Sequence, residues 1–137
     1  MKIVINNCHG GFGLSEKGML RYAELKGITV YPVKTDYGTM DYLTVHPDKA
    51  TPPLADWHKA SIAARKASNE AHTKEHLYDR DIPRDDKDLV TVVEELGREA
   101  SDKYADLKVV EVPDDADWEI DEYDGSEWVS EKHRRWS

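Results

Sequence analysis

The segment 118–129 leaves little choice of local structure. Two runs rich in aromatic and β-branched residues, Trp118 to Tyr123 and Ser126 to Val129, are joined by Asp124 and Gly125. An Asp-Gly pair supplies the positive φ angles that a two-residue hairpin turn needs. The sequence therefore predicts two antiparallel strands here.

Apolar periodicity predicts the elements around this hairpin. Short β-branched runs indicate strands at 3–5, 28–33, 42–45 and 107–112, with Pro32 at a sheet edge. A helix is expected between the N-cap Ser15 and the stop signal Gly27. A second helix is expected after Asp85 or Asp86, with one apolar face formed by Leu89, Val92, Val93, Leu96 and Ala100.

Residues 46–80 differ in character from the rest of the chain. After the proline-rich break at 52–53, Leu54 and Trp57 lead into alanines at helical intervals, which predicts an inserted helix from about Ala55. The whole order predicts an α+β fold, in which a largely antiparallel β-sheet is flanked by two main helices. We expect one domain over residues 1–137, with residues 46–80 as a helical insert.

The charge of the chain restricts its partners. Its 137 residues hold 28 acidic and 19 basic side chains, giving a net charge of -9. Residues 81–137 alone have a balance of -11, whereas residues 1–80 have +2. Binding of duplex nucleic acid is not expected, because it depends on clustered Lys and Arg. Solubility is the simplest reason for the acidity, and mimicry of nucleic acid is the alternative.

Membrane, secretory and disulfide classes are not favoured. The apolar runs are only a few residues long, whereas a spanning helix needs about 20. The first residues lack the apolar stretch of a secretory signal, and the single Cys8 allows neither an internal disulfide nor a CxxC zinc framework. We expect a soluble intracellular protein.

The glycine-rich loop at residues 6–13 is the first candidate site. It lies between a predicted strand and a predicted helix, where backbone amides are able to hold phosphate. It is not the dinucleotide fingerprint, because Glu16 stands where the third glycine belongs. Phe12, the only phenylalanine, is a candidate for stacking on a base. The alternative is that the glycines serve only a tight turn.

Two pairs of residues that contain histidine suggest chemistry only weakly. Cys8 and His9 are adjacent, but neighbours in an extended chain point to opposite sides, so a nucleophile–base pair is not favoured. His72 and His76 share one helical face without the glutamate of the zinc-protease motif. A solvated helix face is the simpler interpretation. We expect no catalytic residues, no metal and no cofactor.

Arginines and aromatic residues form the remaining candidates. Arg84 precedes the second main helix, where it can help the helix N-terminus to hold an anion, and Arg134 lies in the C-terminal tail. Trp118 and other aromatic residues of the last 20 residues offer faces on which a base can stack. The residues alone favour the alternative, in which tryptophans fill the core and arginines pair with surface carboxylates.

Three stretches together resemble the type 1 Thoeris anti-defence proteins of phages. They are residues 1–6 with Gly10-Gly11-Phe12; Arg84-Asp85-Asp86 running into residues 89–97; and Trp118, Ile120, Tyr123-Asp124-Gly125 and Glu127, followed by His133-Arg134 and Trp136. The resemblance covers most of residues 1–33 and 81–137. Residues 46–80 lie outside it.

The resemblance implies binding without catalysis. Such proteins sequester a cyclic ADP-ribose signal made by TIR-domain enzymes, in the cytoplasm of the infected bacterium. Some also hold cyclic oligonucleotides, and members are dimers or higher oligomers. A nucleotide-cleaving enzyme and an acidic inhibitor of a host protein are the alternatives. The ligand-binding residues implied here are Asn6, His9, Gly10, Gly11, Phe12, Arg84, Trp118 and Arg134.

Overall fold

The fold is mixed α+β, as the sequence predicts. The computed structural model describes residues 1–132, and within them three α-helices accompany six strands in three antiparallel two-stranded sheets. The pairs are β1 with β4, β2 with β3, and β5 with β6. The elements are β1 Lys2–Asn6, α1 Glu16–Lys26, β2 Tyr31–Lys34, β3 Met40–Leu43, α2 Ile62–Lys74, α3 Lys87–Leu96, β4 Leu107–Glu111, β5 Trp118–Tyr123 and β6 Ser126–Glu131.

The chain divides into two compact units. The first unit contains residues 1–26 and the chain from residue 79 onward, and the second contains residues 27–78. The expected insert 46–80 therefore falls almost wholly in the second unit, together with β2 and β3. Of the buried apolar side chains, only Tyr42 and Leu43 belong to the second unit. The main core belongs to the first unit.

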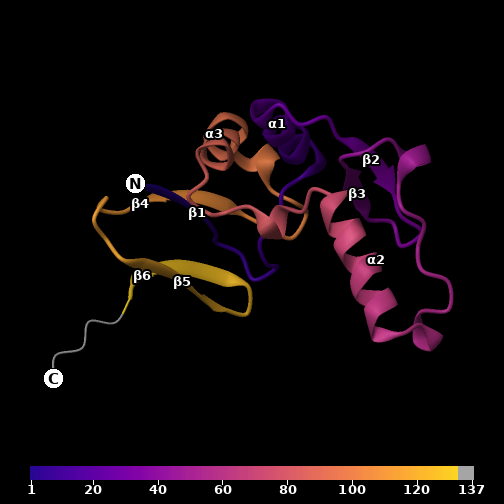
Figure 1. Ribbon diagram of the computed structural model, residues 1–137. Coiled ribbons are helices and arrows are strands. Elements are labelled where there is room, and N and C mark those ends of the chain that lie inside the picture. Colours follow the sequence, from indigo (N-terminus) through magenta and orange to yellow (C-terminus); the bar gives the residue numbers. More distant parts are fainter. Residues whose placement is uncertain (133–137) are drawn as a thin grey trace, which may run out of the picture. The chain divides into compact units, whose positions relative to one another are not determined.

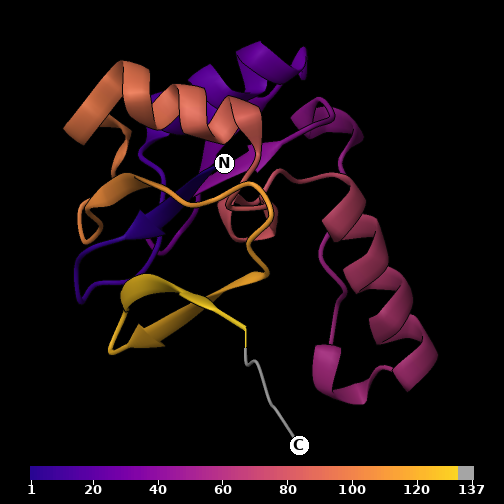
Figure 2. The ribbon, with the colours of Figure 1, turned by 90° about the vertical axis from the view of Figure 1, so that its left-hand side faces the viewer.

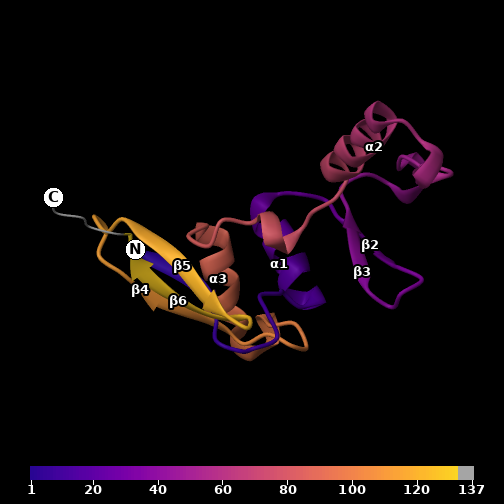
Figure 3. The same ribbon diagram turned by 90° about the horizontal axis from the view of Figure 1, so that it is seen from below.

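The first unit is layered. Helices α1 and α3 pack side by side and cover one face of the β1–β4 pair, while the β5–β6 hairpin lies on the other face (Figures 1 and 2). The neighbouring positions of α1 and α3 are also clear from below (Figure 3). Ile3, Val4 and Ile5 are all buried because β1 is covered on both faces. This explains a continuous apolar run where alternation would mark a half-exposed strand.

Polar side chains begin the two helices of the first unit as predicted. Ser15 Oγ accepts a hydrogen bond from the Gly18 amide at 3.0 Å. Asp86 Oδ1 accepts from the amides of Asp88 and Leu89 at 2.8 and 3.2 Å. These bonds satisfy amides that the first turn of a helix leaves without partners.

The hairpin is also confirmed. Strands β5 and β6 pair from Trp118 opposite Glu131 to Tyr123 opposite Ser126. Asp124 and Gly125 form the turn with φ values of 50° and 88°. In an antiparallel pair, opposed residues share a face, so Trp118, Ile120, Glu127, Val129 and Glu131 lie on one side of the hairpin.

Three sequence expectations need correction. The strands form three separate pairs instead of one sheet. The helix expected from about Ala55 begins at Ile62, after the N-cap Ser61, and Trp57 lies in a separate short 3-10 turn. The face expected to run to Ala100 is interrupted at Gly97, whose φ of 59° ends α3 before a final 3-10 turn buries Ala100.

The second unit has few buried side chains. Strands β2 and β3 form a two-stranded pair that places Pro32 opposite Tyr42. The first and last residues of each strand lie within three residues of the limits predicted from the sequence. Helix α2 has no fully buried residue.

None of the helices in residues 1–132 has the length and apolarity that a membrane span requires.

Candidate functional site

Arg84 connects three separate parts of the first unit. Its guanidinium lies over the Phe12 ring, 3.7 Å from the ring centroid. Nη1 and Nη2 donate to the two carboxylate oxygens of Glu127 at 2.5 and 2.9 Å. The backbone of Arg84 also accepts a hydrogen bond from the Val4 amide. The loop after β1, the segment before α3 and the hairpin therefore meet at this arginine.

Asn6 is fully buried and fully engaged at the same place. Its Nδ2 donates to the carbonyls of Cys8 and Gly125, at 2.7 and 2.8 Å. Its Oδ1 accepts from the Asp106 amide, and its own backbone amide donates to Glu127. Both side-chain hydrogens are used, so Asn6 shapes the loop. A direct contact between Asn6 and a ligand stays a prediction.

Glycines allow the loop to pack closely against its neighbours. A Cβ atom on Gly10 would overlap the carbonyl oxygen of Tyr104. A Cβ atom on Gly125 would lie 2.5 Å from the His9 carbonyl oxygen. Gly11 differs, because its φ is 92° and its missing Cβ would project into open space. Close packing thus explains Gly10 and Gly125, and a left-handed turn explains Gly11.

This loop contains backbone donors without partners. Within residues 1–132, the backbone amides of His9, Gly10 and Phe12 donate no hydrogen bond, whereas the Gly11 amide lies against Gly125 and closes the turn at residues 9–10. His9 and Gly10 are exposed, and Gly11 and Phe12 are half-buried. Free amides close together beside a guanidinium are a suitable environment for an anionic oxygen. The loop is the best candidate for a phosphate site.

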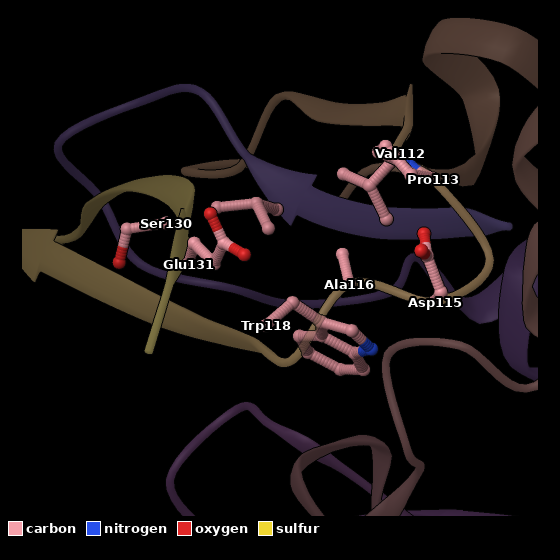
Figure 4. Close-up of a pocket in the computed structure, with 8 residues that line it drawn as sticks. Val112, Pro113, Asp115, Ala116, Trp118, Ser130 and Glu131 are labelled. Atoms are coloured by element: carbon pink, nitrogen blue, oxygen red, sulfur yellow. The ribbon is translucent and has the colours of Figure 1, made fainter. Parts of the chain in front are cut away.

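Trp118 lies away from this loop. It stands at the open end of the hairpin, opposite Glu131, whereas Glu127 and Gly125 lie at the turn end. Five strand residues separate these ends by about 17 Å. Trp118 lines a different cavity, of about 400 Å³, between the hairpin and the turn at residues 112–116 (Figure 4). The structure thus brings together Asn6, His9, Gly10, Gly11, Phe12 and Arg84, but not Trp118.

The other candidates are placed as follows. Cys8 is a half-buried free cysteine and His9 is exposed, with no hydrogen bond between their side chains in the described part of the chain. His72 Nε2 lies 3.1 Å from the Thr51 carbonyl, and His76 Nδ1 lies 2.6 Å from the His72 carbonyl. No cluster suited to a metal ion occurs among residues 1–132. Arg134 lies outside the described residues.

Glu127 is the central residue that sequence reasoning missed. It shares its hairpin face with Trp118, Ile120 and Val129, and its side chain is 10% exposed. A buried carboxylate requires a cationic partner. The same face also carries Glu122 and Glu131, so strand alternation alone contained no signal that singled out Glu127.

Comparison of the chain with protein-family models, curated proteins and solved structures gives no match. A functional assignment therefore rests on the residues and on the geometry described above.

Proposed function

We propose that this protein binds a cyclic ADP-ribose type of nucleotide and withholds it without altering it. The observation that carries the proposal is the set of free amides of His9, Gly10 and Phe12, next to the guanidinium of Arg84. A diphosphate provides several acceptor oxygens for such donors. The ligand class itself comes from the resemblance to Thoeris anti-defence proteins.

The distribution of the resembling stretches supports this proposal. Gly10-Gly11-Phe12, Arg84 and Glu127 come from three distant parts of the sequence and meet at one place. Residues 46–80, which lie outside the resemblance, belong almost entirely to the other unit. A set of shared motifs that converges in space is expected when they form one site.

Arg84 serves the proposed site in a restricted way. Both of its terminal nitrogens already bind Glu127, and one face of its guanidinium covers Phe12. A phosphate that bound Arg84 through the same two nitrogens would have to displace the carboxylate. We therefore assign the first phosphate contacts to the loop amides, with Arg84 holding Phe12 and the loop in position.

Self-association is part of the proposal. Trp57 is 38% exposed and Ile62 is 84% exposed, and both line a groove of about 660 Å³ along α2. Solvent exposure of two large apolar side chains beside each other is typical of a contact surface. Analytical ultracentrifugation of the wild-type protein and of Ile62→Lys tests this: the variant should shift toward monomer, and an unchanged sedimentation profile would remove this face from the interface.

Depletion and recovery test the main proposal. The protein is mixed with cyclic ADP-ribose isomers and cyclic oligonucleotides, and the flow-through of a filter is analysed for missing compounds. The retained compound is then released by heat and identified by mass. Intact recovery supports sequestration, whereas an altered product indicates an enzyme. If nothing is depleted, the nucleotide proposal is wrong, and an acidic inhibitor of a host protein becomes the better account.

A further inference from the structure

The Trp118 cavity has a chemical character different from that of the glycine loop. Its apolar walls are the indole of Trp118 with Val112, Pro113, Ala116 and Val129. Asp115 and Glu131 add two carboxylates, which lie on either side of Ala116 in Figure 4. The volume of about 400 Å³ falls in the range of small-molecule sites.

Local ion pairs neutralise the acidic residues on both sides of Asp115. Asp114 binds the amino group of Met1 at 2.5 Å, and Asp117 lies 3.6 Å from Lys132 Nζ. Asp115, between them, has no cationic partner within residues 1–132. Of the two carboxylates that line the cavity, Asp115 is therefore one that no cation of residues 1–132 neutralises. A phosphate entering here would meet like charge.

An aromatic face next to carboxylates favours a cation. The π face of an indole attracts positive charge, and a nearby carboxylate strengthens the attraction at short range. We propose that the Trp118 cavity binds an organic cation of small size, with a flat or alkylated charged group lying on the indole and Asp115 facing its charge. This inference is independent of the proposed nucleotide function, because it uses none of the residues of the glycine loop.

Two probes that differ mainly in charge test the proposal. Nicotinamide is neutral, and 1-methylnicotinamide has the same ring with a methyl group and a positive charge. Each is titrated into ¹⁵N-labelled full-length protein while the indole N–H resonances are followed. Trp118→Phe assigns the resonance of Trp118, and the other three tryptophans serve as internal references.

The cation should shift the Trp118 resonance saturably, with an apparent affinity about tenfold higher than that of the neutral ring. Asp115→Asn should weaken this binding several-fold. Asp85→Asn removes the same charge from an exposed position of the same unit and should leave the affinity unchanged. Equal affinity for both probes, equal effects of the two variants, or no shift at Trp118 would each overturn the proposal.

Discussion

The guanidinium carbon of Arg84 lies 3.7 Å from the centroid of the Phe12 ring, while the edge of the same guanidinium binds Glu127. This stack joins the loop after β1 to the segment before α3. Because the planar group is held on one face and along one edge, its orientation is fixed. Arg84 is thus first a positioning residue, and the loop whose amides it adjoins depends on it.

Replacement of Arg84 by alanine should lower the free energy of unfolding by about 2–3 kcal/mol, because it leaves the nearly buried Glu127 with the Asn6 amide but without its cationic partner. Urea denaturation followed by circular dichroism measures the change. Arg84→Ala combined with Glu127→Ala should lose less than the sum of the two single variants. Additive losses would show that the pair contributes no coupling energy.

Lys17→Ala is the control for this experiment. The pair between Lys17 and Glu99 is exposed at 60% and 66%, so its loss should cost less than about 1 kcal/mol. An effect as large as that of Arg84→Ala would mean that burial does not explain the importance of the Arg84 pair.

Gly10→Ala should destabilise the protein by about 1–3 kcal/mol, because the new methyl group overlaps the backbone carbonyl of Tyr104, which cannot rotate away. Thermal unfolding by calorimetry is a suitable measurement. Gly27→Ala provides a comparison with a positive φ of 72° but free space around the new atom. A smaller loss at Gly10 than at Gly27 would contradict the close contact with Tyr104.

Tyr22 makes stability dependent on alkaline pH. Burial, together with a hydrogen bond to Asp86 at 3.1 Å, raises the pKa of Tyr22 to about 12. The neutral phenol is favoured in the folded state, so its stabilisation is complete below about pH 10 and is lost as the pH rises toward about 12. The free energy of unfolding should fall by about 2 kcal/mol across this interval.

Absorbance titration of the tyrosines together with denaturation at each pH measures this effect. Tyr22→Phe should remove a tyrosine transition near pH 12 and flatten the alkaline fall in stability. Tyr37→Phe is a suitable control, since Tyr37 is 94% exposed. The interpretation would be wrong if Tyr22→Phe left both curves unchanged.

The first unit should fold without the second. Nearly all buried apolar side chains belong to residues 1–26 and 79–132, and only Tyr42 and Leu43 do not. A chain with residues 27–78 replaced by a flexible Gly/Ser linker should therefore unfold cooperatively and keep any ligand bound at the glycine loop. Calorimetry and the depletion assay measure both properties. A non-cooperative transition would show that residues 27–78 are needed for the core.

Local signals in the sequence predicted much of the first unit. Asp124-Gly125, Ser15 and Asp86 each determine their structure through bonds or φ angles within a few residues, and each lies where it was expected. The pairing of strands into three separate sheets depends on distant contacts that no local pattern contains. In the second unit, Trp57 lies outside the helix that its spacing suggested, because Ser61 caps a later start.

The candidate site was predictable only in part, because residue types are local signals whereas distances between elements are not. The glycine loop and Arg84 were recognised by residue type, but the distance between Phe12 and Trp118 depends on which end of the hairpin faces the loop. The role of Glu127 required knowledge of its strand face. Arg134 lies outside the described residues, so its role as a phosphate contact stays a prediction.

A comparison of Gly11→Ala with Gly38→Ala tests the central claim most directly. Both glycines have positive φ values, 92° and 82°, and both have open space where a Cβ would be, so the two substitutions should strain the backbone alike. Only Gly11 lies in the glycine loop, where an added methyl group would occupy the open space beside the free amides. The dissociation constant of the depleted nucleotide, measured by calorimetry, should therefore rise about tenfold or more in Gly11→Ala and stay unchanged in Gly38→Ala. Equal affinity in both folded variants would contradict the assignment of the phosphate site to this loop.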